Sequence, residues 1–439
     1  MNHNRLFTYA GILAAVIASF QFLPFVPILS FTFSFIFSSI IYLFFAYELS
    51  RKELSQRVLY LLLGLFFCVR LCFIDTLPVS SDDIYRYMWD GKVQVNGINP
   101  YLYPPNAAAL ESLHSAVIPK LVNQPNLPTI YFPFSEWIFY LSFLISGEHV
   151  WGLKILILAA EIATTLLLMV TTTIAGISKR FTLLYAACPL PIFMYALDAH
   201  VDVFGLTFLV LFLYLFLNKR FAFSLAALAF SLSIKPAALI VLPILFFSER
   251  SLKKRLYIAA VPPLLLIAQF IPYMISVNPF STLFAFTKHW TFNGSVFNLL
   301  DLFIMNNQTS RSICAGLLML SILFLSFNKQ RLTDKIYFAF LLLLIFSPIV
   351  HPWYIGWVTV LIPLTRKWSG IVFAAGASVT SITPLNYLLN NTWKDYPAVL
   401  FIEYLPVAAL LIYELFIVQK ISGDQLHEEI TNMTTAMRQ

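Results

Sequence analysis

Long apolar stretches alternate with short polar segments along most of the chain. Many of the stretches approach the ~20 residues that a helix needs to cross a bilayer. The pattern predicts an all-α polytopic membrane protein with roughly 11 to 14 transmembrane helices. The expected helices cover residues 7–24, 29–48, 58–76, 150–176, 181–197, 203–217, 221–234, 237–247, 256–273, 310–327, 336–347, 353–364, 369–383 and 397–418.

Several of these expected helices are shorter than a bilayer requires. Pro189, Pro191, Pro236 and Pro243 lie in or beside the short ones. Proline removes a backbone donor and kinks or breaks a helix. We therefore expect these segments to be tilted, broken or sheltered by neighbouring helices.

Short basic clusters separate the apolar stretches. Because cytoplasmic loops of membrane proteins carry an excess of Lys and Arg, these clusters are expected to be cytoplasmic. The other loops then lie on the external side, and the longest of them is 77–149. The clusters lie at residues 51–57, 179–180, 219–220, 250–255, 329–335 and 366–367.

This topology divides the chain into four parts. Transmembrane helices occupy 1–76, and the long external loop 77–149 is expected to carry short helices of its own. Residues 150–420 form the main transmembrane bundle with short external loops, and 421–439 form a cytoplasmic tail.

The composition agrees with this topology. Of the 439 residues, 59% are hydrophobic and only 11% are charged, whereas a soluble domain keeps roughly 25% charged residues. Membrane lipids must therefore solvate most of the outer surface. The net charge of +7 reflects the Lys and Arg excess of cytoplasmic loops, so no nucleic-acid partner is expected.

Two adjacent carboxylates, Asp82 and Asp83, open the long external loop. Arg86 and Asp90 follow at helical spacing, beside large aromatic residues. A charged helical face at the membrane surface can raise the pKa of a carboxylate for general-base work. The structural alternative is a helix start with Ser81 as its N-cap.

Polar residues also interrupt apolar sequence at the external end of a helix hairpin, in Asp198-Ala199-His200-Val201-Asp202. Two carboxylates and an imidazole at alternate positions could chelate a metal ion, but no other clustered ligand accompanies them. We therefore expect these side chains to line a polar cavity that binds hydroxyl groups or a positive charge.

Lys235 stands alone in an apolar stretch. An ammonium at that depth is costly, so it should face water, an acidic partner or an anionic ligand; snorkelling towards the surface is the alternative. His289, His351, Trp353 and Tyr354 lie on the same expected side. Carboxylates can deprotonate a hydroxyl and cations can stabilise a departing phosphate, so this set of residues suggests sugar transfer.

Six motifs, in this order and spacing, resemble the bacterial polyprenyl-phosphate-mannose-type glycosyltransferases of the glycosyltransferase C (GT-C) superfamily. The resemblance extends from about residue 75 to residue 365, and Phe132 departs from the Tyr-Pro-Pro pattern of the family. The motifs are Ser81-Asp82-Asp83-Ile84-Tyr85-Arg86-Tyr87, Trp89-Asp90-Gly91, Gly97-Ile98-Asn99-Pro100-Tyr101, Asp198-Ala199-His200-Val201-Asp202, Ile234-Lys235-Pro236 and His351-Pro352-Trp353-Tyr354.

The resemblance implies a GT-C-like bundle whose first external loop carries the catalytic carboxylate. The reaction would move a hexose, with mannose expected, from a polyprenyl-phosphate-linked donor to a hydroxyl of a glycan or lipid acceptor. Transfer would be an inverting displacement on the non-cytoplasmic side of the bacterial inner membrane. The alternatives are a transporter or flippase of lipid-linked sugars, which does not need a carboxylate pair on a long loop, and a structural subunit with a degenerate site.

The resemblance also assigns roles to residues. Asp82 is the expected general base, with Asp83 orienting the acceptor or acting as the base itself. Because a monophosphate leaving group flanked by cations needs no divalent ion, no metal cofactor is expected. The candidates for binding the donor phosphate are Arg86, Lys235, His289 and His351, and those for binding the sugar or acceptor are Asp90, Tyr101, Asp198, His200, Asp202, Trp353 and Tyr354.

Overall fold

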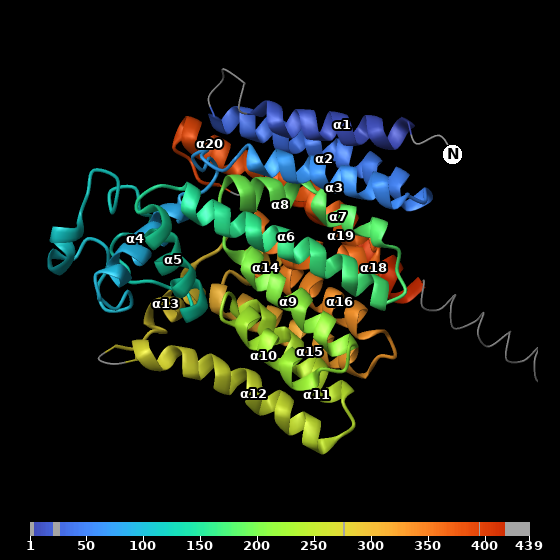
Figure 1. Ribbon diagram of the computed structural model, residues 1–439. Coiled ribbons are helices and arrows are strands. Elements are labelled where there is room, and N and C mark those ends of the chain that lie inside the picture. Colours follow the sequence, from blue (N-terminus) through green and yellow to red (C-terminus); the bar gives the residue numbers. More distant parts are fainter. Residues whose placement is uncertain (1–3, 21–26, 275–276, 395, 418–439) are drawn as a thin grey trace, which may run out of the picture.

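The computed structural model describes residues 4–20, 27–274, 277–394 and 396–417, and regular structure within these ranges is helical (Figure 1). Six helices are long and apolar enough to cross a membrane, and a bent pair, Lys179–Ala186 with Pro189–Leu197, would make a seventh. The prediction of an all-α polytopic membrane protein is confirmed; the expected spans, roughly 11 to 14, include several apolar helices that are shorter than this length. The expected cytoplasmic tail, 421–439, lies outside the described residues.

The helices follow the expected order closely. The N-terminal part contains α1 (Asn4–Ser19), α2 (Pro27–Arg51) and α3 (Gln56–Leu71), and the long loop contains α4 (Asp83–Val95), η2 (Ala108–Leu113) and α5 (Pro133–Ser146). Next come α6 (Trp151–Ile174), η3 (Lys179–Thr182), α7 (Leu183–Ala186), α8 (Pro189–Pro191), η4 (Ile192–Leu197), α9 (Asp202–Leu217), α10 (Phe221–Leu232), η5 (Pro236–Ile240) and α11 (Val241–Ser248). The remainder comprises α12 (Leu252–Phe270), η6 (Ile271–Tyr273), α13 (Ser281–His289), α14 (Ser295–Ile304), α15 (Asn307–Phe327), α16 (Leu332–Phe346), η7 (Pro352–Ile355), α17 (Gly356–Thr359), α18 (Ile362–Thr365), α19 (Trp368–Gly376), η8 (Ala377–Ser381), α20 (Ile382–Asn390), α21 (Pro397–Ile412) and η9 (Tyr413–Ile417).

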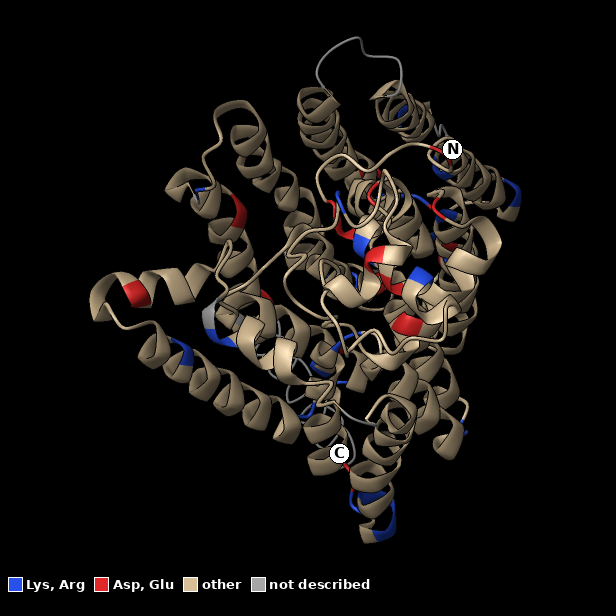
Figure 2. Ribbon diagram, turned by 90° about the vertical axis from the view of Figure 1, so that its left-hand side faces the viewer, with Lys and Arg blue, Asp and Glu red and all other residues tan. Residues whose placement is uncertain are grey.

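The long loop lies at one end of the helix bundle. In Figure 1, α4, α5 and α13 are at the left, whereas α18, which precedes the basic pair Arg366 and Lys367, is at the right. Figure 2 faces the end that carries the loop, and acidic and basic positions gather there on the helices nearest the viewer. The loop and the α18 end of the bundle thus lie on opposite sides.

A broken helix leads from the α18 end of the bundle to the end that carries the long loop. Its two halves, Lys179–Ala186 and Pro189–Leu197, meet at an angle of 49°. Pro189 and Pro191 lie at the start of the second half, where their missing N–H groups and fixed φ angles prevent a continuous α-helix. The broken span that the prolines predict is therefore present, and it delivers Asp198 to the loop end.

A buried ion pair, together with a bond to a backbone oxygen, joins α3, α6 and α7. The guanidinium of Arg70 donates to Glu161 at 2.6 Å and to the backbone oxygen of Ala186 at 2.7 Å. The hydroxyl of Tyr185 donates to the other Glu161 oxygen at 2.5 Å. Both charged side chains are almost fully buried, and buried charges need such partners. The network fixes α3, from which the long loop departs.

Candidate active site

Asp83 lies at the first position of α4 and faces the bundle. Its side chain is 20% exposed, and its Oδ2 atom lies 3.6 Å from Nδ1 of His200. The Tyr87 hydroxyl donates a long hydrogen bond, 3.4 Å, to the same oxygen. Burial, followed by the neighbouring charge of Asp82, raises the pKa of Asp83 to about 6. A carboxylate with a pKa near neutrality is suited to proton transfer.

Asp82 has a different environment. It precedes α4 and makes no side-chain capping bond, and it is exposed to solvent. The side-chain amide of Asn123 donates to Asp82 at 2.8 Å and to Asp83 at 2.7 Å. The two carboxylates are thus joined by an amide, and only Asp83 lies beside the buried histidine.

An aromatic stack extends from His200 into the bundle. The imidazole of His200 lies parallel to the Trp353 indole, with centroids 3.6 Å apart. Trp353 stacks in turn on His351 at 4.3 Å, and His351 on Phe292 at 4.7 Å. Residues from three distant parts of the chain therefore meet on the side of Asp83. This agrees with the expectation that they lie on the same side of the membrane.

Both histidines in the stack are neutral near pH 7. Burial and the nearby charge of Lys235 lower the pKa of His200 well below its usual range. The same two causes lower the pKa of His351 to about 3. Neither ring nitrogen of His200 has a hydrogen-bond partner within the described part of the chain. The histidines can therefore offer hydrogen bonds to a ligand, but not positive charge.

Lys235 supplies the positive charge in this cluster. Its ammonium donates to Asp202 at 2.8 Å, and its side chain is 23% exposed. It also lies 3.6 Å from the centroid of the Tyr354 ring, in a cation–π contact. The indole of Trp357 donates to the same Asp202 oxygen at 3.0 Å. Of the options that the sequence leaves open, an acidic partner for Lys235 is the one found.

Gly205 allows this arrangement on α9. A Cβ atom at this position would lie 2.8 Å from the Trp357 ring, closer than atoms can pack. The missing side chain lets the indole lie against α9 and reach Asp202 at the start of the helix. The hydrogen bond from Trp357 to Asp202 thus depends on a close approach between α9 and α17.

Asp198 lies behind the site and holds the start of the long loop. Its side chain accepts hydrogen bonds from the backbone N–H of Val79 at 2.7 Å, from that of Ser80 at 3.3 Å and from the Ser80 hydroxyl. Asp198 is fully buried, and burial raises its pKa to about 6. In this structure its carboxylate binds the chain just before Asp82 and Asp83.

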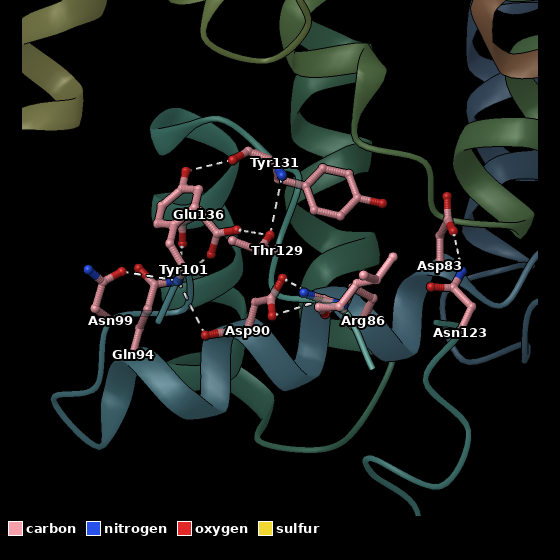
Figure 3. A network of polar contacts seen from close by, with 11 residues as sticks. Asp83, Arg86, Asp90, Gln94, Asn99, Tyr101, Asn123, Thr129, Tyr131 and Glu136 are labelled. Carbon is pink, nitrogen blue, oxygen red and sulfur yellow. Dashed lines mark hydrogen bonds and ion pairs between the residues drawn. The ribbon is translucent and has the colours of Figure 1, made fainter. Parts of the chain in front are cut away.

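Arg86 and Asp90 form a separate buried network within the long loop (Figure 3). The Nε atom of Arg86 donates to both Asp90 oxygens, at 3.0 and 2.9 Å, and its Nη1 donates to the backbone oxygen of Leu127 at 2.9 Å. Glu136 lies in the same network and accepts from Thr129 at 2.7 Å. These contacts join α4 to α5, and none of them is made with the aromatic stack that begins at His200.

Tyr101 is a further predicted site residue that lies elsewhere. Tyr101 packs with Phe132 and Phe270 in a small apolar cluster, and its hydroxyl donates to the backbone oxygen of Tyr131 at 2.6 Å. His289 ends α13, and its side chain lies outside the described residues. The structure therefore brings together Asp83, His200, Asp202, Lys235, His351, Trp353 and Tyr354, with Asp82 at the rim.

The residues of the site region that were not predicted include Asn123, Glu136 and Trp357. Asn123 lies in a loop without a motif, so the sequence carries no signal for it. Glu136 is an acidic residue in an otherwise apolar helix, which is a usable signal for a buried functional or structural group. Trp357 follows the His351–Tyr354 motif at a helical spacing of four from Trp353.

The geometry combines a carboxylate with raised pKa, a lysine and two neutral imidazoles beside stacked aromatic rings. This set can accept a proton, stabilise an anion and contact the face of a sugar ring. Among the described residues there is no group of three or more His, Cys, Asp or Glu side chains placed to hold a metal ion. The absence of a metal requirement remains a prediction.

Comparison with known proteins identifies the family. The family model described as "Alpha-(1->6)-mannopyranosyltransferase, N-terminal domain" matches residues 11–248, more than half of the chain. No curated protein and no solved structure matches the chain. The predictions of an enzyme and of a GT-C relationship are confirmed. The chain belongs to this alpha-(1->6)-mannopyranosyltransferase family and is a GT-C-type membrane mannosyltransferase.

Proposed function

We propose that the protein transfers mannose from a polyprenyl-phosphate donor to a hydroxyl of a glycan or lipid acceptor, with inversion at the anomeric carbon. The observation that carries the proposal is the position of Asp83 beside the cluster of Lys235, His200 and His351. That cluster places a base and a cation in one site that adjoins the apolar bundle. Transfer from a lipid-linked sugar phosphate needs a base for the acceptor hydroxyl, a cation for the phosphate and an apolar surface for the lipid.

The reaction follows from the charges of the site. Asp83 accepts the proton of the acceptor hydroxyl while the hydroxyl oxygen attacks the anomeric carbon of the donor. The bond between that carbon and the phosphate oxygen breaks, and polyprenyl phosphate leaves with the electron pair. Lys235 stabilises the negative charge that develops on the phosphate, and neutral His200 or His351 donates a hydrogen bond to it. A single displacement of this kind inverts the configuration at the carbon.

The resemblance favours Asp82 as the base, but Asp83 suits this role better. Asp83 is mostly buried with a pKa of about 6, whereas Asp82 is exposed. A base with a pKa near the working pH combines a useful ionised fraction with a strong driving force for proton transfer. In this proposal Asp82 raises the pKa of its neighbour and lies near the entering acceptor.

The site is proposed to face the non-cytoplasmic side of a bacterial inner membrane. The positive-inside rule supports this orientation, because the basic pair after α18 lies at the end of the bundle opposite the long loop (Figure 1). Cysteine-accessibility labelling tests the orientation in a variant without Cys68 and Cys72, which are exposed free thiols. Cysteines at the exposed positions Asn96 and Lys253 should label from outside and from inside, respectively. Labelling of Asn96 from the cytoplasm would reverse the proposed orientation.

A transfer assay tests the chemistry. Purified protein is incubated with polyprenyl-phosphate [³H]mannose and a membrane extract, together with Asp82→Asn and Asp83→Asn variants. We expect label to move to the acceptor, transfer to be lost in Asp83→Asn, and the product to carry the inverted anomeric linkage. The proposal is wrong if label never leaves the lipid, or if both variants transfer it as fast as the parent. Unchanged rates in the presence of a chelator would support a metal-independent reaction.

A further inference from the structure

The segment between η2 and α5 folds back over the start of α4 and is anchored on both sides of Asn123. Ile118 and Val122 are buried in the main hydrophobic core. On the other side, Arg86 donates to the backbone oxygen of Leu127 at 2.9 Å. Asn123 itself is half-buried. The fold therefore fixes the backbone of Asn123 above the two carboxylates.

One terminus of the Asn123 side chain contacts both carboxylates. Its Nδ2 atom lies 2.8 Å from Oδ1 of Asp82 and 2.7 Å from Oδ1 of Asp83. Carboxylate oxygens accept hydrogen bonds, and an amide nitrogen has two hydrogens to donate. Each hydrogen is thus directed at a different carboxylate, and the capacity of the nitrogen as a donor is fully used.

This bridge holds together two side chains that a helix does not hold together itself. Asp82 precedes α4 and Asp83 is the first residue of this helix, and consecutive residues at a helix start do not face each other. Two adjacent carboxylates also repel when both are ionised. A shared donor restrains both side chains and lowers this repulsion. With Oδ1 of Asp83 restrained, its Oδ2 is directed towards His200.

We propose that Asn123 is a positioning residue for the transfer reaction: it bridges Asp82 and Asp83, favours the ionised form of Asp83 and orients Oδ2 of Asp83 towards the reacting hydroxyl. This inference rests on the proposed function of the pair. Asn123 acts through the two carboxylates and does not itself take a proton. Its contribution is expected in the turnover number and in the pH dependence, not in binding of the donor.

The ionisable groups around the pair set the background for the pH dependence. Hydrogen bonding by Asn123 lowers the pKa of Asp83, in opposition to burial and to the charge of Asp82. The groups facing the pair are Tyr85 and Tyr87 on α4, Tyr131 before α5, His200 in the loop after η4, Asp202 on α9, Lys235 before η5 and Tyr354 on η7. Substitution of Asn123 leaves all of these groups in place.

Two substitutions with different electrostatic effects test the proposal. Asn123→Ala removes both hydrogen bonds, so the carboxylate anions lose a stabilising donor and the pKa of the base rises. Asn123→Asp has nearly the same shape but adds a third negative charge, so it raises this pKa further. We expect the acidic limb of the kcat/KM profile to move upward by about one pH unit in Asn123→Ala. The shift should be larger in Asn123→Asp, and kcat should fall about tenfold or more at nearly constant donor KM.

Asn126→Ala is the matched control. Asn126 lies in the same segment, is exposed, and accepts a hydrogen bond from Asn106 rather than contacting the carboxylates. Its variant should keep the parental pH profile. The proposal is overturned if the Asn123 variants lose activity without moving the acidic limb, or if Asn126→Ala moves the limb equally. If Asn123→Ala does not fold, the position of the acidic limb in the nearly isosteric Asn123→Asp variant tests the role of Asn123.

The same experiment separates this proposal from the function on which it rests. Asp82→Asn and Asp83→Asn are assayed alongside the Asn123 variants. If Asp83→Asn abolishes transfer while the Asn123 variants keep the parental limb, only the role of Asn123 is wrong. If both aspartate variants transfer at the parental rate, the proposed chemistry is wrong, and the proposed role of Asn123 is then wrong as well.

Discussion

The ammonium of Lys235 donates a hydrogen bond to Asp202 at 2.8 Å. An ammonium has three N–H donors, so this bond leaves two of them available. The Lys235 side chain is 23% exposed, and the Tyr354 ring lies 3.6 Å away on one side. Asp202 thus fixes the direction of a cation that can still bind a phosphate.

Replacing Lys235 should therefore abolish most of the transfer. In Lys235→Met the departing phosphate loses its cation, and we expect kcat to fall by roughly 10²- to 10³-fold. Lys235→Arg should keep part of the activity, because the charge remains while its geometry changes. Transfer rates of purified variants measure both effects. Lys253→Met, at an exposed position, is the control, and an equal loss there would point to a general charge effect.

The pH dependence of transfer should report the Asp83 carboxyl. Its pKa of about 6 is raised from the usual value by burial and by Asp82, so transfer should decline as the pH falls below about 6, when the base becomes protonated. Asp82→Asn removes the neighbouring charge, which lowers the pKa of Asp83 and moves the acidic limb to lower pH. The kcat/KM profiles of parent and variant test this. A limb that moves to higher pH in Asp82→Asn would contradict the assignment of Asp83 as the base.

The sequence predicts most of the helices, and it predicts that several polar residues lie at the same end of the bundle, for physical reasons. Apolar stretches bounded by basic clusters indicate where most of the helices begin and end. Pro189 and Pro191 predict the broken span that the structure contains. Polar residues such as Lys235 and Asp202 are too costly to bury alone, so their pairing could be expected once both lie at one end of the bundle.

Other features depend on the path of the loop and cannot be predicted from local patterns. The bond from Asn123 to Asp83 spans forty residues, and no periodicity relates the two positions. Tyr101 follows turn residues that fit a binding loop equally well, yet it packs against Phe132 and Phe270. The Arg86–Asp90 pair has helical i,i+4 spacing, which favours an ion pair within α4. In the structure the pair is buried, and Arg86 is bonded to Asp90 and Leu127 rather than to residues of the Lys235 cluster.

Asp198 provides a test between two roles. The sequence places it among the sugar- or acceptor-binding candidates, whereas in the structure it holds the backbone of Val79 and Ser80. Asp198→Asn should loosen the chain before Asp82 and lower kcat about tenfold to a hundredfold, with donor KM nearly unchanged. Ser80→Ala, which removes only the hydroxyl donor, should cause a smaller loss. A rise in KM with kcat preserved would instead support direct contact between Asp198 and the sugar or acceptor.

Glu136 should make the stability of the long loop depend on pH. Burial, followed by the charge of Asp90, raises the pKa of Glu136 well above its usual value, because Arg86 alone must neutralise two carboxylates. A raised pKa means that the stabilisation is complete below the unfolded-state pKa of about 4.3 and is lost as the pH rises through the folded-state value. Thermal unfolding in detergent should therefore show a melting temperature that falls with increasing pH, and Glu136→Gln should weaken that dependence.

Arg86 offers the complementary test of the same network. Arg86→Met leaves Asp90 buried without its cation and removes the bond to Leu127, which should destabilise the loop by about 3–5 kcal/mol. Glu136→Gln keeps the network neutral and should cost far less. If the guanidinium instead bound the donor phosphate, Arg86→Met would raise donor KM while the melting temperature stayed near that of the parent. Loss of thermal stability together with transfer would assign Arg86 to the architecture of the loop, because a residue held by Asp90 and Leu127 acts through the position of α4.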